Sequence, residues 1–481
     1  IILLEAVRRF VVPAMMWLAV VFIGYMFAAP YLPGMLHHEA IPFDRMIEIF
    51  YLLSDEGIYG QITGVSATFV ALFVIFGAFI HSTGTGKFFT DLACRLAGGS
   101  RGGPAKIAVV SSGLFGTISG VAAANVYATG TFTIPMMRKL GYRRQFAGAV
   151  EAAASTGGML MPPIMGAGAF VMAEITGIPY ITICKAAAVG ATLYYVSIGF
   201  MVHFEAVKNG LRAMLPEEIP SWRQVSSGWH LIIPLVGLVY LLVKGYSPFW
   251  SAFVAIVLTL VVNYVVTIFS MLLTKSAAPL KSEDFMTPVK IFEALAYGGR
   301  NMIMIAAACA GAGLIIAVIT YSGLGLMMSS VIVSFSHGIF YLACFFIMIA
   351  SIILGMGLPC TPAYIIAVSI GGPTLLKMGG DTLPVHLFVF YFAILAGVTP
   401  PVSIAAYAGA ALAGTNPIKT GFEAFRLAIA GFIVPYVFIR DYSLLLQGPV
   451  VTIVLGVLVM LFSVLLIAAG LIGHISVSYT H

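Results

Sequence analysis

Four short stretches of small and polar residues interrupt long apolar segments, and they are where this chain could bind ions. Residues 116–125 and 355–361 are rich in glycine and hydroxyl groups, and residues 155–163 and 396–401 each end in a Pro-Pro pair. Proline and glycine break helices and leave backbone carbonyl oxygens exposed, and oxygen ligands suit a hard cation such as Na⁺. The N-termini of half-helices attract anionic groups.

Side chains in the same stretches could complete such sites. They offer the amide of Asn125 and the hydroxyl groups of Thr117, Ser119, Thr156, Thr361 and Thr399. Glycine allows the close backbone approach that such sites need. The alternative is that these residues are helix kinks and packing contacts, because Gly, Ser and Thr are common where membrane helices meet.

A repeat of prolines favours the binding interpretation. Pro135, Pro162, Pro163 and Pro179 recur as Pro373, Pro400, Pro401 and Pro417, each 238 residues later, with the spacings 27, 1 and 16 preserved. A pair of interrupted hydrophobic helices at matching places in two halves of a chain indicates the binding site of a transporter.

Composition places these motifs in a membrane. The chain is 60% hydrophobic and 9% charged, with a mean hydropathy of +1.05, whereas soluble domains carry about 25% charged residues. We predict an all-α polytopic membrane protein, so the net charge of +6 does not indicate nucleic-acid binding. The five cysteines form no metal-binding spacing and no nucleotide motif occurs, so we expect no cofactor and no metal other than Na⁺.

Two apolar segments have lengths that fit neither one membrane span nor two. Residues 104–139 and 338–377 are interrupted in the middle by glycine or proline. Each fits a re-entrant helical hairpin with arms of about 15 residues. We predict ordinary or broken spans near 10–30, 62–81, 145–174, 181–205, 229–246, 249–273, 301–320, 385–413, 421–439 and 449–473.

Loop charges orient these spans. With the N-terminal Arg8 and Arg9 in the cytoplasm, 19 Lys and Arg residues fall on the cytoplasmic side and 5 on the outer side. The first hairpin then opens to the cytoplasm and the second to the outside. Five crossings separate the starts of the two repeats, and this odd number makes them inverted-topology repeats.

The predicted organisation has five parts. They are an N-terminal scaffold helix and outer loop (1–54), a first repeat (55–205, with hairpin 104–139 and broken helix 145–174), linker helices (206–292), a second repeat (293–440, with hairpin 338–377 and broken helix 385–413) and a C-terminal scaffold helix (441–481).

Few ionisable residues lie at membrane depth. Glu151 could relay a proton or an ion, or it could pair with a basic residue near the cytoplasmic face. We expect Glu174 and Glu205, at helix ends, to be solvated. The matching position of the first repeat carries no tyrosine, so Tyr407 has no counterpart there. We predict that it contacts substrate or serves in packing.

Ordered motifs in both repeats give the chain a family resemblance. They read GPAKIA at 103–108, GTISG at 116–120, ANVYATGTFTIPMM at 124–137, EAAASTGGMLMPPIMG at 151–166 and GMGLP at 355–359. The sequence resembles the large permease of TRAP (tripartite ATP-independent periplasmic) transporters over most of residues 55–440, and the TAXI-type permeases in particular.

The resemblance implies a prokaryotic inner-membrane importer with Na⁺ coupling and an elevator-like movement in the lipid bilayer. It also implies an extracytoplasmic substrate-binding protein, a small organic anion as substrate, and a small four-helix membrane subunit that is fused upstream of Ile1 or separate. Family ion sites match Ser119 with Gly158, Met161 and Pro163, and Gly357 with Thr399 and Pro401.

Together these arguments predict three sets of site residues. The first Na⁺ site comprises Thr117, Ser119, Asn125, Gly158, Met161 and Pro163. The second comprises Gly355, Gly357, Thr361, Ala396, Thr399 and Pro401. Substrate contacts come from Ser119, Thr156, Gly157, Thr361 and Tyr407.

Three other functions remain open at this point. An H⁺-coupled organic anion transporter would use Glu151. A channel could also contain paired re-entrant segments, but it needs no broken spans. An intramembrane enzyme needs a carboxylate, His or Ser–Lys constellation at membrane depth, and the sequence indicates none.

Overall fold

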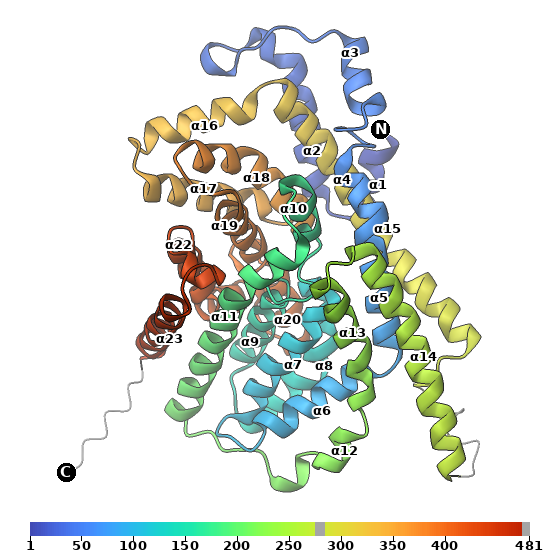
Figure 1. Ribbon diagram of the computed structural model, residues 1–481. Helices are drawn as coiled ribbons and strands as arrows, with labels where there is room; N and C mark the ends of the chain where they lie inside the picture. The colour runs from blue at the N-terminus through green and yellow to red at the C-terminus, as the bar shows by residue number, and fades with distance from the viewer. Residues whose placement is uncertain (275–283, 474–481) are drawn as a thin grey trace, which may run out of the picture.

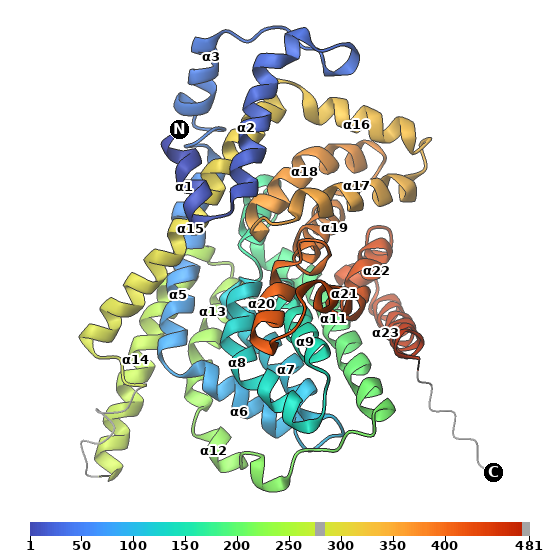
Figure 2. The ribbon, with the colours of Figure 1, turned by 180° about the vertical axis from the view of Figure 1, so that it is seen from behind.

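The computed structural model describes residues 1–274 and 284–473, and in these ranges every regular element is helical (Figures 1 and 2). The N-terminal part and first hairpin consist of α1 (Ile2–Phe10), α2 (Pro13–Ala28), α3 (Phe43–Ile47), α4 (Gln61–Val65), α5 (Ala71–Ser82), α6 (Thr85–Ala97), α7 (Gly103–Ser119) and α8 (Ala122–Leu140).

The middle of the chain contains the first broken helix, the linker and the start of the second repeat. Its elements are α9 (Arg144–Gly157), α10 (Gly168–Thr176), α11 (Tyr180–Lys208), α12 (Trp222–Ser226), α13 (Ile233–Val243), α14 (Pro248–Thr274), α15 (Pro288–Tyr321) and α16 (Leu324–Phe335).

The C-terminal third repeats the pattern of hairpin and broken helix. Its elements are α17 (Phe340–Gly355), α18 (Cys360–Lys377), α19 (Thr382–Leu395), α20 (Ile404–Ala413), α21 (Pro417–Leu427), α22 (Ile429–Phe438) and α23 (Val450–Ile472).

Seven helices of the described chain are long and apolar enough to cross a membrane. They are Pro13–Tyr31, Gln61–Ser82, Tyr180–Lys208, Pro248–Leu272, Pro288–Tyr321, Pro417–Phe438 and Val450–Ile472. An eighth candidate is the pair Pro216–Ser226 and Trp229–Val243, which are bent by 67° against each other and count as one span only together. This confirms a polytopic, all-α membrane protein, although α15 begins 13 residues earlier than the predicted span at 301.

Each predicted hairpin segment forms two helices that meet at a glycine-containing turn. Gly120, between α7 and α8, has φ of 61°, and Gly357, between α17 and α18, has φ of 79°. Glycine adopts this left-handed conformation without the steric cost that a side chain adds. Whether these hairpins re-enter the same face of the bilayer stays a prediction.

The breaks in the two long helices share an unusual backbone at the repeat spacing. The peptide bonds Pro162–Pro163 and Pro400–Pro401 are both cis, and two residues further on Met165 and Ser403 both have positive φ. Helix α9 ends at Gly157 and α10 begins at Gly168, while α19 ends at Leu395 and α20 begins at Ile404. The two breaks begin at equivalent positions, but α20 begins two positions earlier than the equivalent of Gly168, so the second break is shorter.

The equivalent helices α6 and α16 lie at opposite ends of the molecule, which supports an inverted relation between the repeats (Figures 1 and 2). The helices α2, α5, α14 and α15 gather on one side, and the hairpins and broken helices on the other. The inversion and the domain limits stay predictions, and the linker 206–292 and the C-terminal unit 441–481 reach partly outside the described residues.

Helices of the two repeats cross where both carry glycine. A Cβ atom at Gly148 on α9 would lie 2.8 Å from the carbonyl oxygen of Gly409 on α20, and one at Gly409 would lie 2.3 Å from the carbonyl oxygen of Gly148. Small residues let membrane helices approach this closely. The first and second repeats are therefore in direct backbone contact.

This contact predicts the effect of a larger side chain. We expect Gly409→Leu to lower the free energy of unfolding by about 1–3 kcal/mol, because α9 and α20 must separate to admit it. Thermal unfolding of the detergent-purified chain measures the change. The matched control is Gly470→Leu on α23, where a Cβ meets no atom within 4 Å. Equal destabilisation by both substitutions would contradict the prediction.

Candidate functional site

The tip of the first hairpin rests directly on the first break. A Cβ at Gly116 of α7 would lie 2.3 Å from the Cα of Gly158, and 3.1 Å from the Nδ2 atom of Asn125. Only glycine at both positions allows the end of α7 and the end of α9 to touch backbone to backbone. The structure thus brings two residues of the first predicted ion site, Asn125 and Gly158, which lie 33 positions apart in sequence, close to Gly116.

The second hairpin and second break meet in the same way. A Cβ at Gly355 would lie 2.9 Å from the Cβ of Ala396 and 3.2 Å from the carbonyl oxygen of Ala393. Ala396 occupies the position that Gly158 holds in the first repeat. In each repeat, the first residue of the break therefore lies against a hairpin tip.

Each hairpin tip and the break that it contacts form a half-site, and the two half-sites also touch each other. A Cβ at Gly166, in the first break, would lie 2.7 Å from the Sγ atom of Cys360 at the start of α18. Gly168, where α10 begins, packs against the side chain of Tyr364 on the same hairpin. The first break is therefore in direct contact with the second hairpin.

Buried oxygen atoms without a partner lie in the first half-site. Asn125 is fully buried and its Nδ2 donates to the Ser112 carbonyl at 2.9 Å, while its Oδ1 accepts no hydrogen bond from the described residues. The Oγ atom of Ser119 is also buried and unpartnered there. Buried polar atoms are almost always paired, so these two oxygens could serve a bound cation.

The carbonyl of the second proline in each break accepts a tyrosine hydroxyl. The hydroxyl oxygen of Tyr180 lies 2.8 Å from the Pro163 oxygen and 2.5 Å from that of Ile164, and the hydroxyl of Tyr407 donates to Pro401 at 2.7 Å. Tyr180 was missed by the sequence analysis, although it follows the shared proline Pro179. The Tyr407 hydroxyl already has an acceptor, and its contact with substrate stays a prediction.

Other predicted residues have their polar groups engaged locally. The hydroxyl groups of Thr117, Thr156 and Thr399 donate to backbone carbonyls three or four residues earlier in the chain, at 2.6, 2.9 and 2.8 Å. Gly157 lies against the ring of Tyr194, and Thr361 is buried near the start of α18. Their roles as ligands stay predictions.

Met161 and Gly357 complete the predicted sets. Met161 lies beside Thr117 on a groove that faces away from Ser119. Gly357 lies in the turn of the second hairpin, where a Cβ would be 3.6 Å from Val402 of the second break. The residues of the first predicted ion site are thus spread over two sides of α7.

A cavity of about 170 Å³ separates the first half-site from α5 and α15. Ser119, Gly120 and Met165 line it from the hairpin and the break, and His81 and Asn301 line it from the opposite helices. The sequence analysis did not identify His81 or Asn301, because a single polar residue in an apolar span gives no indication of what it faces.

Glu151 lies at the centre of four hydroxyl groups. Its side chain is fully buried and accepts hydrogen bonds from Ser112 at 2.5 Å, from Ser155 at 3.3 Å, and from Thr129 and Thr133. An ionised carboxylate offers about four acceptor positions, which this hydroxyl shell fills. No described basic group forms an ion pair with Glu151, so the alternative of a basic partner is wrong for this structure.

The hydroxyl shell belongs to the first repeat alone. Moving each member by 238 positions gives only apolar residues or glycine: Ala350, Ala367, Gly371, Val389 and Ala393. The five polar side chains of the first repeat are thus absent together in the second. This pattern indicates that they act as one unit.

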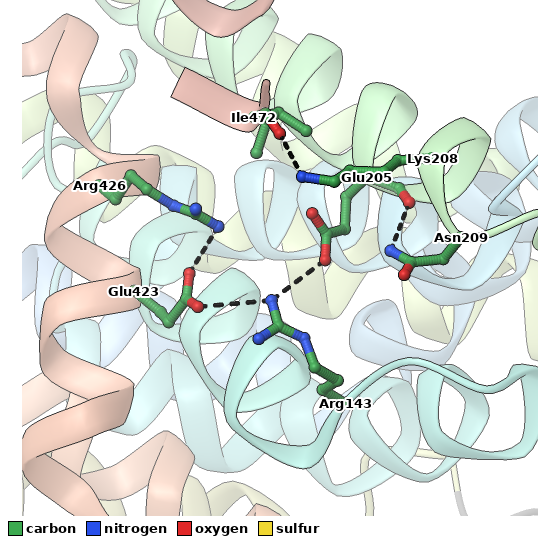
Figure 3. Close-up of polar contacts among 7 residues, drawn as sticks. All are labelled: Arg143, Glu205, Lys208, Asn209, Glu423, Arg426 and Ile472. Carbon is green, nitrogen blue, oxygen red and sulfur yellow. Dashed lines mark hydrogen bonds and ion pairs between the residues drawn. The ribbon is translucent and has the colours of Figure 1, made fainter. Parts of the chain in front are cut away.

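Glu205 is buried and ion-paired, so the expectation that it is solvated is wrong (Figure 3). Arg143, just before α9, lies 3.1 Å from Glu205 at the end of α11 and 3.4 Å from Glu423 on α21, which pairs with Arg426 at 2.7 Å. Glu205 is 5% exposed. Glu174 is exposed, as expected. The network joins the start of α9 to α11 and α21. These segments lie far apart in sequence, so no local sequence pattern predicted it.

Comparison with known proteins gives one family. The model described as "Tripartite ATP-independent periplasmic transporter, DctM component" matches residues 1–453. A C4-dicarboxylate TRAP transporter large permease of Pseudomonas aeruginosa is 29% identical over 192 residues, which cover 39% of this chain and 44% of that protein. The chain thus matches less than half the length of this relative.

A longer match is to another TRAP large permease, and a solved structure has a similar fold. A 2,3-diketo-L-gulonate TRAP transporter large permease of Escherichia coli is 22% identical over 385 residues, covering 78% of this chain and 85% of that protein. The YdaH transporter of Alcanivorax borkumensis superposes with a TM-score of 0.57 at 16% identity, covering 91% of this chain and 99% of the other. The latter likeness concerns the fold alone.

The two tyrosines predict different losses on removal of one oxygen atom. We expect Tyr180→Phe to lower the free energy of unfolding by about 1–3 kcal/mol, because the buried Ile164 carbonyl and the half-buried Pro163 carbonyl lose the hydroxyl donor that they share. Tyr407→Phe should cost less, because Tyr407 is 38% exposed. Thermal unfolding in detergent measures both losses. A larger loss in Tyr407→Phe than in Tyr180→Phe would contradict the prediction.

Proposed function

The chain belongs to the family of the DctM component of tripartite ATP-independent periplasmic transporters, and from this premise we propose that it is the permease of a binding-protein-dependent, Na⁺-coupled importer of small organic anions. Family membership makes it a transport protein rather than an enzyme, and a multi-pass protein of the inner membrane. Its substrate, coupling ion and partners are the proposal.

The observation that carries Na⁺ coupling is the contact of each broken helix with a hairpin tip. At the first junction, the unpartnered oxygens of Asn125 and Ser119 accompany the closely packed glycines Gly116 and Gly158. Carbonyl, amide and hydroxyl oxygens are neutral ligands that suit a hard cation. The second junction, at Gly355 and Ala396, would provide the second Na⁺ site.

An anionic substrate fits the helix termini around the same region. The helices α8, α10, α18 and α20 all begin at a tip or a break, and the partial positive charge of a helix N-terminus favours an anion. The relatives named for C4-dicarboxylate and 2,3-diketo-L-gulonate support a small carboxylate as the transported class.

The arrangement of helices supports an elevator-like movement. The cavity at Ser119 separates the hairpin side from α5 and α15, so the hairpins and broken helices could move as one body past those helices. We further propose that an extracytoplasmic binding protein delivers the substrate, and that a small four-helix membrane subunit, fused or separate, completes the scaffold.

Sodium binding can be measured on the permease alone. We expect NaCl to raise the thermal unfolding midpoint relative to KCl at equal ionic strength, because an ion that binds only the folded state stabilises it. Asn125→Leu and Ser119→Ala should reduce this difference, and Ser463→Ala on α23 should keep it.

Transport tests the coupling itself. In proteoliposomes with the binding protein, uptake of a labelled C4-dicarboxylate should require an inward Na⁺ gradient. Uptake that persists without Na⁺ and collapses without a pH gradient would overturn the proposal.

One observation favours H⁺ coupling as the second candidate. Glu151 is a buried carboxylate surrounded by neutral hydroxyl groups, and an uncompensated charge at membrane depth is costly. A proton would remove that charge, and the hydroxyl shell could hydrogen-bond to either form of the carboxyl group. The restriction of this shell to the first repeat fits a coupling role for one ion.

The variant Glu151→Gln separates the two candidates, since glutamine resembles the protonated form. If protons drive transport, we expect uptake to lose its dependence on the pH gradient and to fall at least tenfold, while Glu174→Gln, at an exposed site, behaves as the unmodified chain. Na⁺-driven uptake with an unchanged pH profile in Glu151→Gln would exclude the H⁺ candidate.

A further inference from the structure

A second, larger cavity opens on the side of α7 that faces away from the predicted substrate region. This groove has a volume of about 750 Å³ and lies between α6, α7 and α11. Most of its lining is apolar, from Leu96, Val109, Val110, Leu114, Val196 and Phe200. Leu96 at its rim is 60% exposed, as expected where a groove faces lipid.

Two positively charged side chains lie where the first hairpin begins. Lys106 lines the groove together with the ring of His203, and Arg101 lies two residues before the start of α7. The Nδ1 atom of His203 is buried and has no hydrogen-bond partner among the described residues. None of the described residues lining the groove is acidic, so this positive charge is not neutralised within it.

The other part of the groove reaches the first break. Thr117, Met161 and Pro162 form part of its wall. A molecule bound in the groove would therefore contact the first break, which also contacts the tip of the first hairpin. Gly199 leaves room in the groove, because a Cβ there would meet no atom within 4 Å.

We propose that this groove binds an anionic phospholipid of the cytoplasmic leaflet. The phosphate lies among Arg101, Lys106 and His203, and one acyl chain follows the apolar wall toward Pro162. Basic pockets between membrane helices on the cytoplasmic side suit anionic headgroups, and the charge distribution of the loops places this end in the cytoplasm. A small carboxylate substrate has no chain to fill the apolar part.

Lipid binding by the detergent-purified full chain tests the charge requirement. We expect phosphatidylglycerol to raise the unfolding midpoint and to remain bound in native mass spectrometry, and phosphatidylcholine to do neither. Arg101→Gln and Lys106→Gln should each weaken phosphatidylglycerol binding about fivefold. Lys139→Gln, an exposed cation near the end of the other arm of the same hairpin that does not line the groove, should leave binding unchanged.

Filling the groove tests the acyl chain without changing charge. Gly199→Trp should abolish the phosphatidylglycerol effect, and Gly470→Trp, at an equally open glycine on α23, should preserve it. Glycerol 3-phosphate, the headgroup anion without acyl chains, should give no shift.

Several results, each sufficient alone, would overturn the proposal. They are equal binding of the two lipids, retention of the phosphatidylglycerol effect in Gly199→Trp, and a full shift with glycerol 3-phosphate. A loss of binding in Lys139→Gln equal to that in Lys106→Gln would also overturn it, because it would show a general response to surface charge.

Discussion

The fold depends on satisfying the backbone where two helices are interrupted in an apolar medium. Lipid offers no hydrogen-bond partners, so irregular backbone at membrane depth must be covered by protein. Here the carbonyls of Pro163 and Pro401 receive tyrosine hydroxyls, and the hairpin tips cover the helix ends beside Gly158 and Ala396. The tips and breaks therefore cover each other's helix ends.

The two repeats share this backbone solution but differ in chemistry. Cis prolines and positive φ values recur at the common spacing, whereas the hydroxyl shell of Glu151 has only apolar counterparts. A repeat inherits its backbone geometry through glycine and proline, which set φ and ψ directly. Side chains that only fill the resulting space can diverge, so the position of Glu151 is the best indication of a function that belongs to one half.

The sequence predicted the helix interruptions, which local chemistry determines. Pro-Pro pairs and glycine clusters indicated where helices are interrupted, and α7, α9, α17 and α19 end at or beside those residues, because these residues act on their own backbone. It failed for contacts between distant positions. Glu205 is paired with Arg143, 62 residues earlier, and no pattern within one helix could indicate that. Tyr180 and Asn301 were missed for the same reason: their importance comes from what faces them.

Helix α7 connects the features that carry function in the first repeat. Ser112 contacts Glu151, Gly116 contacts the first break, and Ser119 faces the central cavity. Val109 and Thr117 line the groove between α6, α7 and α11. A helix with intact hydrogen bonding moves as a rigid rod over these few turns, so a displacement at any one of these contacts shifts the others. Occupation of the proposed ion site, or protonation of Glu151 if H⁺ is the coupling ion, would therefore be energetically coupled through this one helix to occupation of the proposed lipid groove.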